Sequence, residues 1–214
     1  MATPASQAVT NRRRDQRSWH RGLDRDAVVG EALRLLDEEG RDALTMRRLG
    51  DALHVEAASL YAHVAGKDDL IDAVLDRVLD GIELPAPDRD PRTAIVDGFS
   101  AYRRALLAHP TIVLLMTERA RFTRAQARLA TRSIALFEQA GLSTRRAVDV
   151  HVTLVAFVLG FILQEVSRPA APGPALLNDD AVLRRAVAAL VQSTPAERFE
   201  TGLAVILDGA LGSR

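Results

Sequence analysis

The fold is decided by residues 43–76, which read ALTMRRLGDALHVEAASLYAHVAGKDDLIDAVLD. Thr45 is suited to cap a short helix, because apolar residues recur after it at helical spacing. A second short helix is predicted over 56–64, and the small residues at 65–66 end it. A longer helix over 24–40, between an aspartate cap and a glycine, precedes the pair. Two very short helices after a longer one are typical of a helix-turn-helix.

The turn between the two short helices has a matching residue pattern. Gly50 provides the small residue that is needed where the helices nearly touch, and His54 occupies the turn position where glycine is usual. Histidine is among the residues enriched in the left-handed conformation, so this departure costs little. The apolar residues that would lock the pair are Leu49, Leu53, Val55, Leu60 and Val64. An ordinary helical hairpin remains the alternative at this point.

Outside this stretch the sequence predicts only helices. A fourth helix starts at Lys67 and runs to about Glu83, and a proline-containing linker over 84–91 marks a domain boundary. Beyond it, helical spacing predicts helices over 92–108, 111–116, 123–140, 144–166, 181–191 and 195–209, with a loop over 168–178. The chain is therefore expected to be all-α, with a disordered basic arm over 1–22 and domains over 23–84 and 92–214.

Composition narrows the class of protein. The chain has 214 residues, of which 48% are hydrophobic, so a sizeable core can form. It has no cysteine, which excludes disulfides and fits the cytoplasm. The apolar stretch 150–163 is too short for a membrane span, and the five histidines have no paired ligand spacing, so neither a membrane nor a metal is expected. Net charge is zero, but six arginines lie within the first 25 residues.

Three local motifs resemble the tetracycline-repressor family of regulators. They read LTMRRL, SLYAHV and GKDDLI, occur in the order and spacing of that family, and belong to a match over about residues 24–80. YRRALLAHP at 102–110 and LVAFVLGFILQE at 154–165 resemble the tetracycline repressor subgroup itself. The resemblance implies a homodimeric repressor that binds a palindromic operator through the N-terminal helix-turn-helix and is released by a small-molecule effector. The C-terminal domain would then bind the effector and form the dimer.

Residue chemistry in the helix-turn-helix fits contact with DNA. Small side chains at 57–59 let a helix lie deep in the major groove, and Ser59 can bond a base edge. Tyr61, His63 and Lys67 can bond phosphate oxygens, while Arg47 is the best residue for a bidentate contact. The predicted DNA-binding residues are Arg47, Arg48, Ala57, Ala58, Ser59, Tyr61, His63 and Lys67.

The resemblance also places functions in the C-terminal domain. Helices over about 144–166 and 195–211 would pair with their copies as the dimer interface, and Ala156 and Gly160 would permit close approach. The predicted effector-pocket residues are Phe99, Tyr102, Leu106, Met116, Phe122, Phe137, His151 and Phe157. Met116 lies where the tetracycline repressor has a histidine for its metal-chelated drug. No metal or other cofactor is therefore expected.

Two other classes of function compete with the repressor. A small all-α enzyme would need a catalytic cysteine, a metal pair, a phosphate loop or a nucleophile beside a base, and no such motif is recognisable. A ligand-independent activator or architectural DNA-binding protein is not separable from a repressor by sequence. A cytoplasmic, nucleoid-associated regulator that is not an enzyme is therefore the prediction.

Overall fold

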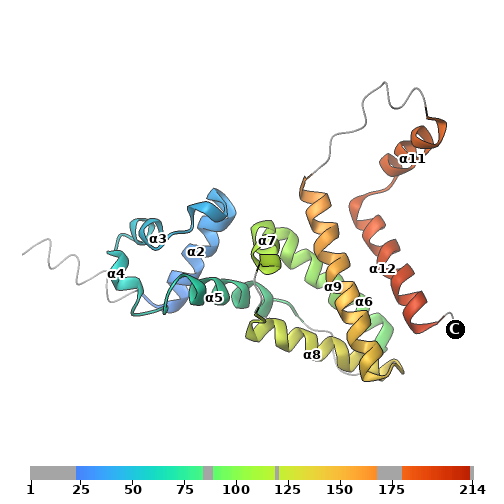
Figure 1. Ribbon diagram of the computed structural model, residues 1–214, viewed down its shortest axis with the longest axis horizontal. Coiled ribbons are helices and arrows are strands. Elements are labelled where there is room, and N and C mark those ends of the chain that lie inside the picture. The colour runs from blue at the N-terminus through green and yellow to red at the C-terminus, as the bar shows by residue number, and fades with distance from the viewer. Residues whose placement is uncertain (1–22, 84–88, 119–120, 168–179, 213–214) are drawn as a thin grey trace, which may run out of the picture. The chain divides into compact units, whose positions relative to one another are not determined.

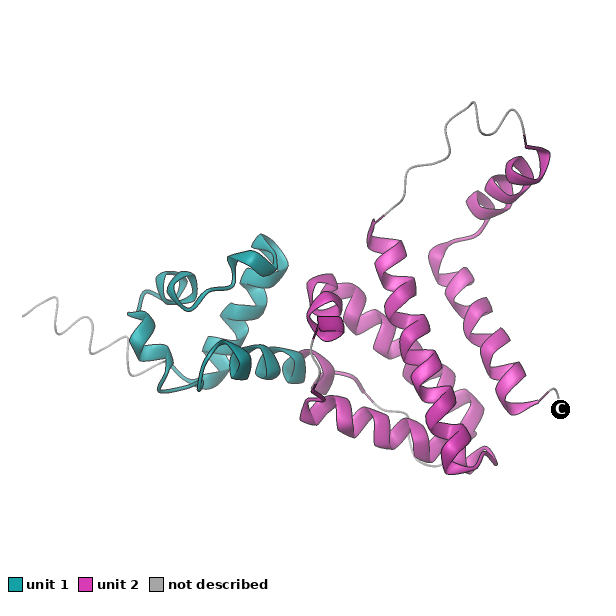
Figure 2. Cartoon of the chain, viewed as in Figure 1, with its two compact units in different colours: residues 1–77 teal, residues 78–214 magenta. Residues whose placement is uncertain are grey.

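The computed structural model describes residues 23–83, 89–118, 121–167 and 180–212, and every regular element among them is a helix. This confirms the predicted all-α fold. The chain divides into two compact units, residues 1–77 and 78–214 (Figure 2). The division falls inside a helix, whereas the sequence predicted a boundary in the linker over 84–91, whose first part lies outside the described residues. The predicted arm over 1–22 and the loop over 168–178 also lie outside them.

Unit 1 consists of short helices around a core of aliphatic side chains. Its elements are α2 (Arg25–Glu39), η1 (Arg41–Ala43), α3 (Met46–Ala52), α4 (Ala57–Leu60) and most of α5 (Lys67–Asp80), as Figure 1 shows. Asp24 caps α2 by accepting a hydrogen bond from the Ala27 amide, and Gly40 follows its end at a φ of +82°. The fully buried core includes Val28, Leu35, Leu49, Leu60 and Val74. The predicted caps at both ends of α2 are confirmed.

Unit 2 is built on three long helices that pack against one another, α6 (Pro91–Ala108), α8 (Arg124–Gln139) and α9 (Thr144–Ser167). The shorter α7 (Pro110–Glu118) and the C-terminal α12 (Pro195–Leu211) both pack on α9 (Figure 1). Between α9 and α12 in sequence, α11 (Ala181–Gln192) has no buried residue in the described chain. Thr123 and Thr194 each form a capping box at the start of a helix. The capping box expected at 194–197 is therefore confirmed.

Helix α9 buries only one of its faces within the described chain. The buried stripe is Ala147, Val150, Leu154, Val158 and Ile162. Val148 and Val152 lie elsewhere on its surface and are 39% and 60% exposed. By length and composition α9 could cross a membrane, and 28% of its most apolar stretch is buried inside the protein. An apolar helix left this exposed requires a cover in water.

Candidate nucleic-acid interface and ligand cavity

Helices α3 and α4 approach each other most closely at Gly50. A Cβ atom at this position would lie 2.9 Å from the Val55 carbonyl oxygen and 3.1 Å from the Ala57 amide nitrogen. The Val55 amide also donates a hydrogen bond of 2.9 Å to the Gly50 carbonyl. His54, in the turn, has a φ of +56° and is the one non-glycine residue at positive φ among the described residues. The two sequence predictions for this turn, at Gly50 and His54, are thus confirmed.

Helix α4 is shorter than the sequence predicted. Only residues 57–60 are α-helical, whereas a helix over 56–64 was expected. The amides of Tyr61, Ala62 and His63 each bond to the carbonyl three residues earlier, so the chain tightens into a 3-10-like turn. Glu56 supplies no side-chain cap at the start. The predicted length was wrong because spacing of apolar residues does not distinguish the two kinds of turn.

Residues 57–64, which we call the α4 segment, pack on the core of unit 1 with one side and are exposed to solvent on the other. Leu60 is fully buried and Val64 is 2% exposed, so both hold the segment to unit 1. Ala58 and Ala62 are exposed, Tyr61 is 55% exposed, and Ala57, Ser59 and His63 are half-buried. The segment therefore presents a face of small and polar groups to solvent.

The neighbouring arginines Arg47 and Arg48 have different surroundings. The Arg48 guanidinium donates two hydrogen bonds to the Glu39 carboxylate, one of 3.1 Å from Nε to Oε2 and a shorter one from Nη2 to Oε1. This pairing raises the pKa of Arg48. Arg47 is exposed and has no ion-pair partner in the described part of the chain. Of the two, Arg47 is the side chain available to a ligand outside the protein.

Arg25 ties the end of the α4 segment to the starts of α2 and α5. Its guanidinium donates to both oxygens of Asp69, at 3.0 and 2.9 Å, and to the His63 carbonyl oxygen at 2.6 Å. The same carboxylate accepts from the Ala65 amide at 2.9 Å. These bonds, first of all those from Arg25, lower the pKa of Asp69. We call this arrangement of Arg25, Asp69, His63 and Ala65 the clamp.

Sequence reasoning missed the clamp because its two charged residues are 44 positions apart. In the sequence Arg25 is one of six arginines within the first 25 residues, and nothing near it points to Asp69. Lys67, the first residue of α5, is exposed and has no ion-pair partner among the residues described. The clamp therefore holds in place the segment between Tyr61 and Lys67, both predicted to bind DNA.

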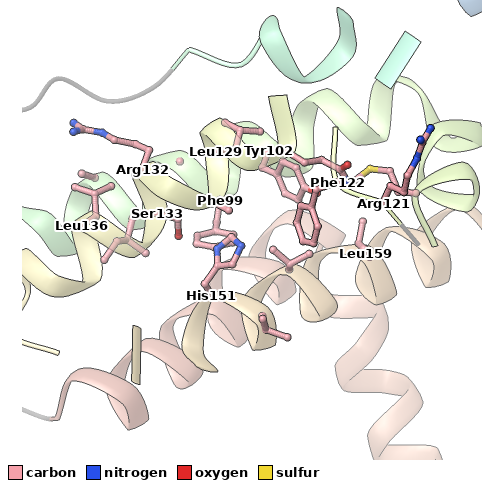
Figure 3. A pocket seen from close by; sticks show the side chains of 18 residues that line it. Phe99, Tyr102, Arg121, Phe122, Leu129, Arg132, Ser133, Leu136, His151 and Leu159 are labelled. Carbon is pink, nitrogen blue, oxygen red and sulfur yellow. The ribbon is translucent and has the colours of Figure 1, made fainter. Parts of the chain in front are cut away.

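Unit 2 contains a cavity of about 300 Å³ between α6, α7, α8 and α9. Five predicted pocket residues line it: Phe99, Tyr102, Met116, Phe122 and His151. Figure 3 shows the side chains of Phe99, Phe122 and His151 directed into the space between α8 and α9. The wall also includes residues that the sequence did not single out, among them Gly98, Gln126, Leu129 and Ser133. The one indication of them in the sequence is that they lie on predicted helices that also carry, or directly follow, predicted pocket residues.

Three predicted pocket residues do not line the cavity. Leu106 and Phe137 are fully buried in the packing of unit 2. Phe157 stacks on Phe199 of α12 with ring centroids 5.4 Å apart, and Phe161 contacts the same pair. All three were selected for their apolar side chains, which a core uses as readily as a ligand does. They are structural residues of unit 2.

The cavity is apolar with a few polar atoms. Ser133 Oγ and His151 Nδ1 are buried and have no hydrogen-bond partner in the described structure. Burial lowers the pKa of His151 and raises the pKa of Tyr102 well above its ordinary value, so both side chains are held in their neutral forms. No cluster of three potential metal ligands occurs among the described residues. The arrangement suits an organic molecule rather than a metal ion.

A helix-turn-helix with an exposed second helix, combined with a helical unit that contains an apolar cavity, defines a ligand-responsive DNA-binding regulator. The family description "Bacterial regulatory proteins, tetR family" matches residues 29–74, and "Tetracyclin repressor-like, C-terminal domain" matches residues 84–212. The chain therefore belongs to the tetracycline repressor family. The predicted family and class of function are confirmed.

Individual relatives agree with this assignment. The tetracycline repressor protein class A from transposon 1721 of Escherichia coli is 32% identical, over 87% of this chain and 90% of that protein. ActR of Streptomyces coelicolor in complex with actinorhodin is 29% identical, with a TM-score of 0.76 over 89% of this chain and 96% of ActR. BioQ with its double-stranded DNA operator is 26% identical, with a TM-score of 0.67 over 89% of this chain and 99% of BioQ.

Proposed function

We propose that this regulator binds a near-palindromic operator as a homodimer and leaves it when a small organic molecule fills the unit 2 cavity. DNA binding is proposed because α4 has a solvent-exposed face of small and polar side chains. Two nearby cations, Arg47 and Lys67, also lack ion-pair partners among the described residues. The repressor relatives and the operator complex of BioQ support this function.

In each half-site, α4 would enter the major groove. The groove is about 12 Å wide and admits a helix whose outer side chains are small, as at Ala57 and Ala58. Ser59 would bond a base edge, and Tyr61 and His63 would bond phosphate oxygens. Because Glu39 already holds Arg48, we assign the bidentate contact with guanine or phosphate to Arg47.

Lys67 would add a further phosphate contact. Its ammonium group stands at the first residue of α5, where free backbone amides favour an anion. The acidic residues in the same turn, Asp68 and Asp69, oppose this attraction, but Asp69 is neutralised in the clamp by Arg25. With Asp69 paired, only Asp68 opposes the Lys67 ammonium in this turn, so the phosphate contact would depend on that ammonium and the backbone amides.

The dimer would form through α9 and α12. The exposed Val148, Val152 and Val205 require a cover, and Val205 on α12 is 67% exposed. A Cβ atom at Gly160 would meet nothing within 4 Å, which leaves room for the close approach of a second helix. Two copies joined in this way would place their α4 helices about 34 Å apart, in successive turns of the major groove.

Regulation by the ligand would pass through α5. This helix belongs to unit 1 up to residue 77 and to unit 2 from residue 78, so it links the two covalently. Arg128 on α8 donates to the Leu79 carbonyl oxygen at 3.1 Å and contacts the Asp80 carboxylate at 3.1 Å. Its neighbour Leu129 lines the cavity. A ligand that shifts α8 would therefore displace the end of α5 and change the spacing of the two α4 helices.

The ligand-responsive repressor is favoured over a ligand-independent DNA-binding protein because of the cavity. Similar proteins have been solved with a ligand bound, ActR with actinorhodin and a tetracycline regulator of Acinetobacter baumannii with minocycline. A cavity of about 300 Å³ with unpartnered polar atoms is within the range of small-molecule sites. A protein without an effector has no need for such a space.

Footprinting on DNA that flanks the protein's own gene would locate the operator, and fluorescence anisotropy would then give affinity across salt concentration. Arg47→Ala should weaken binding and reduce the salt slope by about 0.9 if Arg47 contacts a phosphate. Arg48→Ala is the matched control and should leave the slope unchanged. If the protein has no salt-sensitive affinity for duplex DNA, the proposed function is wrong.

A further inference from the structure

The volume of the cavity indicates how large a ring system it can hold. An apolar cavity of about 150 Å³ in a protein core is sufficient to hold benzene. The cavity here is about 300 Å³, which corresponds to two or three fused rings rather than one. Aromatic side chains at Phe99, Tyr102 and Phe122 form part of the wall, and aromatic rings prefer to pack against other rings in offset or edge-on geometry. A flat aromatic molecule therefore fits the space.

The charges around the cavity select against ionised amines. The lining residues that the structure describes include two arginines, Arg121 and Arg132, and no aspartate or glutamate. Both arginines already have an interaction within the protein. An ammonium group buried here would have no carboxylate partner, so nothing would offset the free-energy cost of removing its charge from water.

The polar atoms of the cavity select for a hydroxyl group. Ser133 Oγ on α8 and His151 Nδ1 on α9 are both buried and both lack a partner in the described structure. An unpaired buried polar atom is costly, so each gains when a ligand supplies its hydrogen bond. A neutral imidazole has one nitrogen that donates and one that accepts. A hydroxyl group can do either, and so it can satisfy His151 in both tautomers.

Resting on the proposed function, we infer that the effector is an uncharged aromatic compound of two or three fused rings. It carries a hydroxyl group that hydrogen-bonds His151 Nδ1, with Ser133 Oγ available to a second polar group. The ring system lies against Phe99, whose ring centroid is 6.4 Å from that of His151. A carboxylate in place of the hydroxyl binds less well, because the imidazole is neutral, most of the wall is apolar, and the two lining arginines already have interactions within the protein.

Four probes of one ring system test the ligand class: 2-naphthol, 2-methoxynaphthalene, 2-naphthoate and 2-naphthylmethylamine. Binding of each to the full-length protein is measured by titration calorimetry, and operator release by anisotropy of labelled DNA. We expect 2-naphthol to bind roughly tenfold more tightly than 2-methoxynaphthalene, because an Nδ1 atom that accepts requires a donor and an ether oxygen can only accept. The carboxylate and the amine should bind more weakly still.

Two variants locate the site. His151→Phe keeps a flat ring and should remove the advantage of 2-naphthol over 2-methoxynaphthalene, and Ser133→Ala is a milder change that keeps the fold if His151→Phe does not. Gly98→Leu should abolish binding of all four probes, because a Cβ at Gly98 meets nothing within 4 Å and the side chain can fill the cavity without a clash.

The outcomes separate this inference from the proposed function. If 2-naphthol has no advantage, if the carboxylate or the amine binds best, or if all four probes fail while operator binding persists, the ligand class is overturned and the DNA-binding function stands. If 2-naphthol binds with the expected preference but operator occupancy does not change, the ligand class holds and ligand-driven release is wrong. A preference for 2-naphthol that survives in both polar variants would also overturn the inference.

Discussion

Gly50→Ala is the most direct test of how the helix-turn-helix is held together. The new methyl group would lie 2.9 Å from the Val55 carbonyl oxygen, which must retreat by about 0.5 Å to reach an ordinary contact of 3.4 Å. That oxygen belongs to the backbone of the turn and cannot rotate away as a side chain can. Overpacking of this kind costs about 1–3 kcal/mol. Alanine gains about 0.5–1 kcal/mol through helix propensity, so we expect a net loss of about 1 kcal/mol and at most about 2.5 kcal/mol.

Gly30→Ala is the matched control within the same unit. It lies inside α2, and its Cβ would meet only the Arg77 guanidinium, at an ordinary 3.7 Å. It should therefore stabilise unit 1 by about 0.5–1 kcal/mol. Urea unfolding followed by circular dichroism gives the free energies, and hydrogen exchange in α2–α4 assigns them to unit 1. Equal stability of the two variants would refute the close-approach argument, as would unchanged operator affinity in Gly50→Ala.

Three further perturbations probe the clamp, the cavity and the link between the units. Arg25→Gln should lower operator affinity about fivefold with an unchanged salt slope, because the clamp residues are partly exposed and Arg25 positions rather than touches DNA; a slope lower by about 0.9 would instead identify a phosphate contact. His151 has a lowered pKa, so its contribution to stability is present above pH 6.5 and is lost as pH falls below that value. Thermal melts at about pH 7.5 and 5.5 should therefore differ more for the wild type than for His151→Phe; equal differences would contradict this. Arg128→Gln should bind 2-naphthol normally but keep its operator when the ligand is added, and normal release would exclude Arg128 from the coupling.

Local signals in the sequence were sufficient to predict most helix ends. Thr45 and Thr194 act as caps through bonds to amides three residues later, so the whole signal lies within one turn. The C-terminal ends of α4 and α5 were predicted too late: α4 gives way to a tighter turn that apolar spacing does not reveal, and the glycine that directly follows α5, Gly81, was passed over. Helix α5 stops at Asp80 rather than near Glu83, and the expected linker begins beyond it.

Contacts between distant residues were not predictable in the same way. The pairing of Arg48 with Glu39 joins residues nine positions apart, so it separates two adjacent arginines that look equivalent in sequence. Helix α9 gives a second example. His151 lines the cavity while Phe157 packs on α12, and helical periodicity alone does not reveal which neighbour each side of the helix faces.

The open position at Gly98 has an evolutionary consequence. Replacing this glycine by alanine within α6 adds about 0.5–1 kcal/mol of helix stability while it narrows the cavity. A substitution at this one codon would therefore change which effectors a descendant of this protein binds, without lowering the stability of its fold. The same position would be a first choice for libraries that seek biosensors for smaller inducers.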